Sequence, residues 1–397
     1  MMITYQEALE SVLRTTLDLG LEKVPLVESV HRILAEDIKA DRDFPPFNRA
    51  TKDGIALNYE GIAQGVSIFK IDGEVSAGSP RQALVNTNAC LEIMTGAVLP
   101  ENTDTVIMYE HITVADGVAS IQKEVKRGQN IHLQGSDLEE GTVILKSGIK
   151  IRAAEIAILA TVGKVNVLVY RVPKVCTVAT GNELVSVAAT PAPHQIRMSN
   201  SIMLQAALKG EQISATTVHI ADDKVALKIA LQTAIGVNDV LLLSGGVSRG
   251  KYDYLPEVLE ELGVQKIFHK VAQQPGKPFW FGIHRNQKTV VFSFPGNPVS
   301  TFVNYYVYFI PWLYTSWCLE FPQKYVRLAN DYKNPTSLTK FIPVTTVQEL
   351  DGLVATFVNQ NGSGDMVSLN KAHGFVCLAP EKETFKAGTL VPFTETV

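Results

Sequence analysis

The chain has 397 residues, 46% of them hydrophobic and 19% charged, so we expect a soluble globular protein of roughly two to four domains. The formal net charge of −4 does not favour nucleic-acid binding. The N-terminal residues lack the pattern of a secretion signal, and residues 298–318 are too polar for a membrane span, so no membrane partner is expected. Four scattered cysteines, without a CxxC pair, favour a reducing cytoplasm and exclude a zinc or disulfide framework.

The first part of the chain mixes helical and β patterns. Residues 3–20 predict an amphipathic helix, and residues 29–37 predict a second, short helix. Two prolines make residues 43–47 a stiff extended linker. Short apolar runs separated by Gly, Asn and Asp predict a β-rich insertion over 54–136.

A further helix is predicted over residues 150–162. Its expected apolar face consists of Ile151, Ala154, Ile158 and Leu159. We expect this helix to pack on the N-terminal helices, which would make their domain discontinuous.

From residue 173 the pattern changes to alternating strands and helices. The predicted strands are 174–179, 214–220, 240–243 and 289–294, and the predicted helices between them are 199–209, 223–234 and 254–262. This alternation predicts a doubly wound, mostly parallel sheet with helices on both faces. After Trp317 the helices stop, and residues 320–397 predict a small β-barrel or sandwich.

The expected organisation therefore has four parts. A discontinuous N-terminal domain covers residues 1–45 and 137–172, and a β-rich insertion covers 46–136. An α/β domain covers 173–318, and a C-terminal β-barrel covers 319–397.

Three glycine-containing turns follow predicted strands, at 244–248, 274–278 and 295–297. Because the carboxyl ends of parallel strands meet at one edge, these turns predict a ligand crevice there. Asn297 is expected to cap a helix that has Pro298 at its first position, and the helix start suits an oxyanion. Lys277, on a rigid turn, is interpreted as an oxyanion clamp.

The segment 245–251 matches the first seven positions of a P-loop. Tyr252 replaces the Ser or Thr that would bind magnesium, so a true P-loop is not expected. Backbone N–H groups of Gly245 and Gly246 can still bind an anion.

Carboxylates at turns are candidates for catalysis or for binding Mg²⁺ together with phosphate oxygens. Glu183 and Asp253 lie on the predicted ligand edge, which favours function. For Asp53 and Asp137, spacing alone favours ordinary solvated turn residues.

Read together, these segments resemble the molybdopterin molybdenumtransferase family, which includes the C-terminal domain of gephyrin. The resemblance covers almost the whole chain and rests on the segments 47–56, 93–100 continuing through Glu110, 128–131 with 135–137, 180–184, 198–201, 244–248, 275–278 and 294–298. It implies a four-domain homodimer whose α/β domain binds molybdopterin. It also implies an active cleft that combines the β-rich domain of one subunit with the α/β domain of the other.

The implied reaction inserts molybdate into adenylylated molybdopterin and releases AMP, with Mg²⁺ as cofactor and a molybdopterin adenylyltransferase as transient partner. The resemblance raises Asp53 and Asp137 to functional candidates. The implied catalytic residues are Asp53, Asp137, Glu183 and Asp253, and the implied metal ligands are Asp53, Glu183, Asp222 and Asp253. The implied cofactor-binding residues are Thr95, Gly96, Thr180, Gly181, Asn200, Ser244, Gly245, Gly246, Ser248, Lys277, Pro295, Gly296 and Asn297.

Three positions depart from the family pattern. Lys52 replaces an apolar residue, Gln274 replaces a common lysine, and Lys251 stands where an acid is common. We expect Lys251 to compensate for Gln274 at a shared anion site. Two alternatives stay open: a molybdopterin adenylyltransferase, which is usually the α/β domain alone, and a non-enzymatic scaffold. The sequence does not distinguish molybdate from tungstate.

Overall fold

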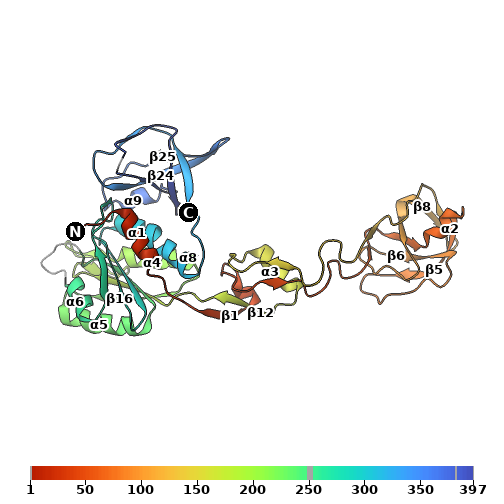
Figure 1. Cartoon of the computed structure of the whole chain (residues 1–397), viewed down its shortest axis with the longest axis horizontal. Coiled ribbons are helices and arrows are strands. Elements are labelled where there is room, and N and C mark those ends of the chain that lie inside the picture. The colour runs from red at the N-terminus through yellow and green to blue at the C-terminus, as the bar shows by residue number, and fades with distance from the viewer. Residues whose placement is uncertain (1, 248–253, 381, 397) are drawn as a thin grey trace. The chain divides into compact units, whose positions relative to one another are not determined.

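The computed structural model describes residues 2–247, 254–380 and 382–396. The chain forms two compact units (Figure 1). The first comprises Met1–Ala35, Lys150–Arg152 and Val167–Val397, and the second comprises Glu36–Ile149 and Ala153–Asn166. Each unit is described separately below.

The centre of the first unit is a six-stranded sheet. Its order is β16 (Ala215–Ile220), β13 (Val175–Thr180), β17 (Val240–Ser244), β21 (Thr289–Phe294), β20 (Trp280–His284) and β18 (Gln265–His269). The first four strands are parallel, which confirms the predicted doubly wound sheet. The two others form an antiparallel edge that the sequence pattern did not predict.

Helices cover both faces of this sheet, because alternate strand residues point to opposite sides. Leu242 and Phe292 belong to one core, and Leu241 and Val291 belong to the other. Figure 1 shows α5 and α6 on one side and α1, α4 and α8 on the other. The helices are α1 (Tyr5–Leu13), α4 (Ser199–Gly210), α5 (Lys224–Val237), α6 (Leu255–Glu261), α7 (Pro298–Asn304) and α8 (Ile310–Ser316), with a π-helical segment η3 (Tyr305–Phe309) between α7 and α8.

Helix α1 packs in the core of this sheet. Thr4 and Glu7 form a capping box that starts it, and Ala8 and Val12 are buried beside Trp312. The indole Nε1 of Trp312 donates to the Thr15 carbonyl oxygen at 2.8 Å. The helix is shorter than predicted, and the expected packing of the 150–162 helix on it stays a prediction.

The prediction of a short helix over residues 29–37 was wrong. The chain instead forms a 3₁₀ turn, η1 (Leu26–Ser29), and His31 adopts a φ of 65°, outside the right-handed helical region. Ile33 and Leu34 then form isolated bridges with Lys150 and Val169.

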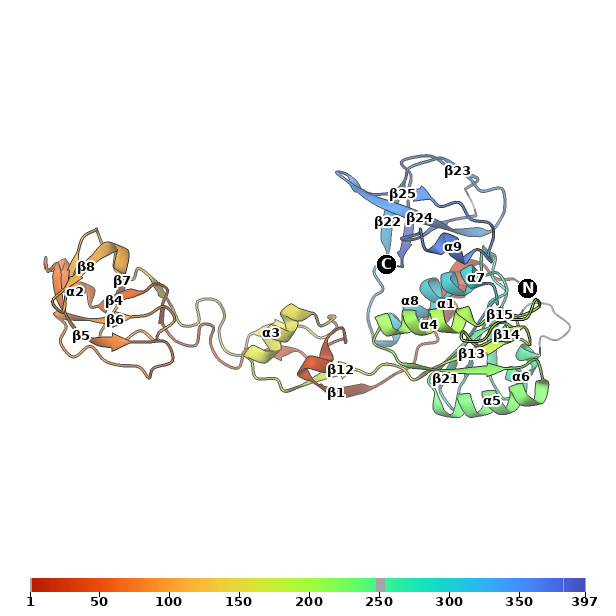
Figure 2. The same ribbon diagram turned by 180° about the vertical axis from the view of Figure 1, so that it is seen from behind.

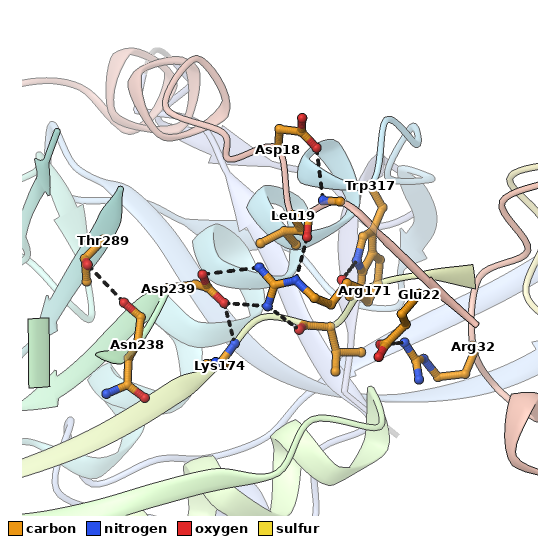
Figure 3. A network of polar contacts seen from close by, with 12 residues as sticks. Asp18, Leu19, Glu22, Arg32, Arg171, Lys174, Asn238, Asp239, Thr289 and Trp317 are labelled. Carbon is orange, nitrogen blue, oxygen red and sulfur yellow. Dashed lines mark hydrogen bonds and ion pairs between the residues drawn. The ribbon is translucent and has the colours of Figure 1, made fainter. Parts of the chain in front are cut away.

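A polar network lies at the amino end of the central sheet strands (Figure 3). Arg171 follows β12 (Asn166–Tyr170), which pairs with β1 (Leu21–Pro25). Its guanidinium donates to the Leu19 carbonyl oxygen at 2.6 Å and to both Asp239 carboxylate oxygens, at 2.8 and 3.3 Å. The Lys174 backbone N–H donates to the same carboxylate at 2.8 Å. These contacts fix the chain where it enters the sheet.

The C-terminal part of the first unit is a closed barrel, as predicted. Its strands run in the order β24 (Thr339–Glu349), β25 (Gly352–Phe357), β22 (Lys324–Leu328), β28 (Leu390–Glu395) and β26 (Gly374–Leu378), and β26 pairs back with β24. The two-residue strand β19 (Gln273–Gln274) joins β24 in parallel. A short helix, α9 (Met366–Leu369), which was not predicted, lies next to α7 (Figure 2). Small pairs are β14 (Leu184–Val185) with β15 (Ile196–Arg197), and β23 (Tyr332–Lys333) with β27 (Thr384–Phe385).

The second unit is β-rich, as expected. Its main sheet has the order β7 (Thr105–Met108), β4 (Gly54–Leu57), β6 (Ala89–Ile93), β5 (Ile68–Val75), β9 (Val118–Ile121) and β8 (Ile112–Ala115). Its other elements are β2 (Ile38–Lys39) with β11 (Val143–Leu145), β3 (Arg49–Ala50) with β10 (Ile131–His132), α2 (Tyr59–Ala63), η2 (Tyr109–His111) and α3 (Ala153–Thr161).

Two details of this unit differ from expectation. Helix α3 buries Glu155 and Leu159, whereas Ala154, expected on the apolar face, is exposed. Residues 43–47 are bent rather than extended, with a cis Phe44–Pro45 peptide bond, and Phe44 forms a bridge with Leu138. Among the residues that the structure describes in both units, no helix has the length and apolar character needed to cross a membrane.

Candidate functional site

The predicted crevice at the carboxyl edge of the sheet is present as a cavity of about 160 Å³. It lies where β13, β17 and β21 end. Gly245 has a φ of 99°, and a Cβ there would lie 2.8 Å from the Thr180 carbonyl oxygen. A Cβ on Gly296 would lie 3.7 Å from the Gly245 Cα atom. The glycines therefore allow the turns after β17 and β21 to approach closely.

Asn200, in the first turn of α4, links two of these turns. Its side-chain Nδ2 donates to Ser244 Oγ at 2.7 Å and to the Gly296 carbonyl oxygen at 2.8 Å. Predicted residues that line the same cavity are Thr180, Glu183, Asn200, Ser244, Gly245, Gly296 and Asn297. The structure thus brings together half of the α/β-domain candidates.

Three buried polar atoms at this edge have no hydrogen-bond partner in the described part of the chain. They are Thr180 Oγ1, Asn200 Oδ1 and Ser201 Oγ. Buried polar atoms in folded proteins are nearly always paired with protein, water or ligand. Their position on the cavity wall makes them available to a bound polar group.

A larger cavity of about 870 Å³ adjoins this edge and shares Gly296 and Asn297 with it. Lys277 lines it on the turn after β19, and Lys340 lines it from β24. Pro295, Ser300 and Ser363 also contribute, and no described Asp or Glu lines it. The cavity is therefore suited to a negatively charged ligand.

One glycine, Gly276, and one asparagine, Asn297, shape this cavity. A Cβ on Gly276 would lie 2.3 Å from Asn304 Oδ1, so only glycine fits the turn before Lys277. Asn297 occupies the N-cap position of α7, with Pro298 first in the helix, as predicted. Its side chain does not cap the helix but donates to Ser363 Oγ at 2.7 Å, so the expected capping bond is absent.

The second unit contains four of the implied site residues. Asp53 Oδ1 accepts from the Thr95 backbone N–H at 2.6 Å and from Thr95 Oγ1 at 2.7 Å. These two bonds, the backbone one first, lower the pKa of Asp53. Gly96 follows with a φ of 85°. Asp137 Oδ1 lies 2.9 Å from His132 Nε2. Asp53 is thus an oriented carboxylate, and its second oxygen has no hydrogen bond to the described residues.

Glu183 and Asp222 flank the turn after β13. The Asn182 backbone N–H donates to Asp222 Oδ2 at 3.3 Å, and the Asp222 N–H donates to Asn182 Oδ1 at 3.0 Å. A Cβ on Gly181 would lie 2.5 Å from Glu183 Oε2. Within the described ranges, no group of three His, Cys, Asp or Glu side chains could hold a metal. Mg²⁺ is commonly bound by one or two carboxylates plus substrate phosphates, so Glu183 and Asp222 stay predicted ligands.

Some predicted residues cannot be placed. Ser248, Lys251 and Asp253 lie outside the described residues. Most of the P-loop-like segment 245–251 also lies outside them. Gly246 is described; its φ is 72°, and a Cβ there would lie 3.0 Å from Thr180 Oγ1.

Sequence reasoning missed the barrel residues Lys340 and Ser363. Each lies in a segment with ordinary β or loop composition, far along the chain from the glycine turns. Only the pairing of β19 with β24 brings Lys340 to the cavity.

The fold and these cavities define a multidomain α/β protein with a polar crevice at the carboxyl edge of its sheet beside a lysine-lined cavity. Three family models match: MoeA N-terminal region (domain I and II) over residues 3–163, probable molybdopterin binding domain over 176–315, and MoeA C-terminal region (domain IV) over 325–395. The chain belongs to the molybdopterin molybdenumtransferase family.

Relatives similar to this chain support that assignment. A molybdopterin molybdenumtransferase of Synechocystis is 38% identical over 99% of both chains. One of Bacillus subtilis is 31% identical over 93% of this chain and 88% of its own length. A solved structure of a molybdopterin biosynthesis MoeA protein from Pyrococcus horikosii has a TM-score of 0.85 and 32% identity, and it covers 100% of both chains.

Proposed function

We propose that this chain is an enzyme of molybdenum cofactor biosynthesis that inserts molybdate into adenylylated molybdopterin. The observation that carries the proposal is the pair of adjoining cavities that share Gly296 and Asn297. One offers glycine turns and unpartnered polar atoms for a phosphate-bearing pterin, and the other offers lysines for an oxyanion. In the reaction water cleaves the pyrophosphate bond of the adenylyl group and AMP leaves. The two dithiolene thiols bind molybdenum in place of one molybdate oxygen, which leaves with their protons as water.

The carboxylates are proposed to act with Mg²⁺. Glu183 and Asp222, with Asp53 and Asp253, would hold the ion, which when bound would neutralise phosphate charge. Asp137 and Asp53 are proposed catalytic residues. Thr95 supports the role of Asp53 because its two hydrogen bonds fix one carboxylate oxygen and leave the other for a ligand.

The test is AMP release from adenylylated molybdopterin in the presence of molybdate and Mg²⁺. Asp53→Asn keeps an acceptor for Thr95 and removes the charge, so AMP release should fall by about 10²-fold or more. Asp116→Asn is the matched control, because Asp116 is an exposed turn residue with a φ of 51°, which Asn tolerates. Equal rates of AMP release for wild type and Asp53→Asn would show that Asp53 is not a catalytic residue.

Two competing functions have distinct readouts. A molybdopterin adenylyltransferase would consume ATP and release pyrophosphate, which the present proposal does not expect. A scaffold would bind a partner without AMP release. The matches over all three regions favour the molybdenumtransferase reading.

We further propose that the protein works as a cytoplasmic homodimer and meets a molybdopterin adenylyltransferase transiently. The four-domain division given above is retained as part of this proposal. In a two-fold dimer with composite sites, mixing Asp53→Asn with Lys277→Ala chains should restore about half of wild-type turnover in the heterodimer. An isolated heterodimer as inactive as either parent would show that each site is built from one chain.

A further inference from the structure

His132 lies between a charged donor and a proposed catalytic carboxylate. It is the second residue of β10, and the antiparallel register places it directly opposite Arg49 of β3. A guanidinium nitrogen of Arg49 lies 3.3 Å from His132 Nδ1, and His132 Nε2 lies 2.9 Å from Asp137 Oδ1. The three side chains therefore form a continuous chain of hydrogen bonds that ends at Asp137.

The chemistry of Arg49 fixes the roles of the two ring nitrogens. A guanidinium group has only donors, so His132 Nδ1 must accept in this contact. In the neutral ring the proton then lies on Nε2, which donates to Asp137 Oδ1. Asp137 thus accepts a directed N–H bond on one oxygen, and its other oxygen has no hydrogen bond to the described residues.

Exposure distinguishes the histidine from the carboxylate that it holds. The His132 side chain is 29% exposed, whereas the Asp137 side chain is 58% exposed. The backbone near each of them is fixed, since the Asp137 N–H donates to the Phe44 carbonyl oxygen at 2.9 Å and the Thr51 N–H donates to the Asn130 carbonyl oxygen at 2.9 Å. The histidine therefore belongs to the framework of the unit, and a ligand can reach the carboxylate.

Strand β3 also supports the other proposed catalytic carboxylate of this unit. The Gly96 backbone N–H donates to the Ala50 carbonyl oxygen of β3 at 2.9 Å. The preceding residue, Thr95, holds Asp53 by two hydrogen bonds. Asp53 and Asp137 are thus each oriented by uncharged donors from segments that are bonded to β3.

We propose that His132 is a positioning residue for the cleavage of adenylylated molybdopterin and acts by holding Asp137 through its Nε2–H group. This inference rests on the proposed function. Arg49 orients the imidazole ring, and His132 fixes one oxygen of Asp137. The second oxygen remains for a polar group of the substrate or for water.

The first experiment compares two replacements of His132 by their rates of AMP release. His132→Phe keeps a ring but removes both contacts, so kcat should fall by about 10- to 100-fold, the scale for losing a partner that orients a functional side chain. The KM for adenylylated molybdopterin should change less. His132→Gln can accept from Arg49 with Oε1 and donate to Asp137 with Nε2, so it should retain most of the wild-type rate. A glutamine variant as slow as the phenylalanine variant would overturn the proposal.

His284→Phe is the matched control. The Nδ1 atom of His284 also accepts a hydrogen bond, from the Gln287 backbone N–H at 3.1 Å. His284 lies opposite Thr289, the first residue of β21, and so at the amino edge of the central sheet. Its replacement should leave AMP release per folded molecule at the wild-type level. If His132→Phe lowered only the thermal midpoint and kept that rate, the role of His132 would be structural and the proposal would be overturned.

A double-variant cycle tests whether His132 acts through Asp137. Asp137→Asn removes the charge that His132 positions, so adding His132→Phe to Asp137→Asn should cause no further loss of rate. If the two losses multiplied, His132 would act independently of Asp137, which would overturn the proposal.

The position of the ring proton can be read without turnover, which separates this inference from the proposed function. Nitrogen-15 NMR of the ligand-free chain at mildly alkaline pH should show His132 protonated at Nε2 only, and a proton on Nδ1 would overturn the proposal. Wild-type protein without AMP release would contradict the reaction, while the NMR result would still report on the ring. Normal AMP release in both wild type and His132→Phe would retain the reaction and reject the role of His132.

Discussion

The two ends of the central sheet differ in how their buried polar side chains are hydrogen-bonded. At the amino end, Asp239 receives two bonds from Arg171 and one from the Lys174 backbone (Figure 3). At the carboxyl end, Thr180 and Asn200 each keep a buried oxygen without a described partner. The first end is satisfied internally and should contribute stability. The second end leaves polar atoms available to a ligand and should contribute less stability.

The largest effect is expected at the ligand side. Lys277→Ala should raise the barrier to AMP release by about 3 kcal/mol, or about 10²-fold in rate, by removing a preorganised oxyanion donor. Its thermal midpoint should be unchanged, because Lys277 is exposed. Lys266→Ala, at an exposed lysine of β18 paired with Glu260, should change neither quantity. If Lys277→Ala lost enough stability to explain its lower activity, the proposed difference between the two ends of the sheet would be contradicted.

The amino end should show the reverse pattern. Arg171→Met should lower the free energy of unfolding by about 2 kcal/mol, because it leaves the partly buried Asp239 carboxylate with fewer charged hydrogen bonds. Activity per folded molecule should stay at the wild-type level. Arg14→Met breaks an exposed pair with Glu10 and should cost almost nothing. Denaturant titration and AMP release measure both quantities.

A smaller effect of opposite sign is expected at Thr180. Thr180→Val removes a buried hydroxyl without a described partner and should stabilise the ligand-free protein by about 1 kcal/mol, while weakening binding of the pterin substrate. Thr177→Val on the same strand is the matched control. The Thr177 hydroxyl lies 2.6 Å from Thr217 Oγ1, so its loss should destabilise by about 1 kcal/mol. Equal destabilisation by both changes would mean that Thr180 is already satisfied.

The smallest effect concerns acid pH. Burial alone would raise the pKa of Asp239, but the bonds from Arg171 and Lys174 outweigh it and lower the pKa. The stability from this lowered pKa is present above the ordinary aspartate value of about 4 and is lost as pH falls through the folded-state pKa. Between neutral pH and about pH 3, wild type should therefore lose more stability than Asp239→Asn. Parallel thermal midpoints across this range would contradict the assignment.

The sequence predicted the central sheet well because its strands are continuous apolar runs separated by clear helical spacing. Val240–Ser244 and Thr289–Phe294 are buried at every residue. The turns at Gly245 and Gly296 followed from glycine and proline chemistry that acts locally. The prediction of a helix over 29–37 was wrong because His31 adopts a positive φ. The spacing of apolar residues gives no information on that backbone conformation.

The parts of the site that sequence reasoning missed depend on long-range pairing. Lys340 reaches the cavity only because β19 joins the barrel, a contact between residues separated by 66 positions. Asn297 illustrates the converse: its N-cap position was predicted, but Ser363 in the barrel competes for its side chain. Composition and periodicity contain no information on either contact.

The packing of α1 has a consequence for the order of events during synthesis. Ala8 and Val12 are buried in a core whose other members include Trp312 and Leu313, about 300 residues later in the chain. The second unit draws all of its residues from the range 36–166 and is complete long before that core exists. Because domains generally fold as the ribosome releases them, the second unit should fold first. The N-terminal helix should remain without its partner until the ribosome has passed α8.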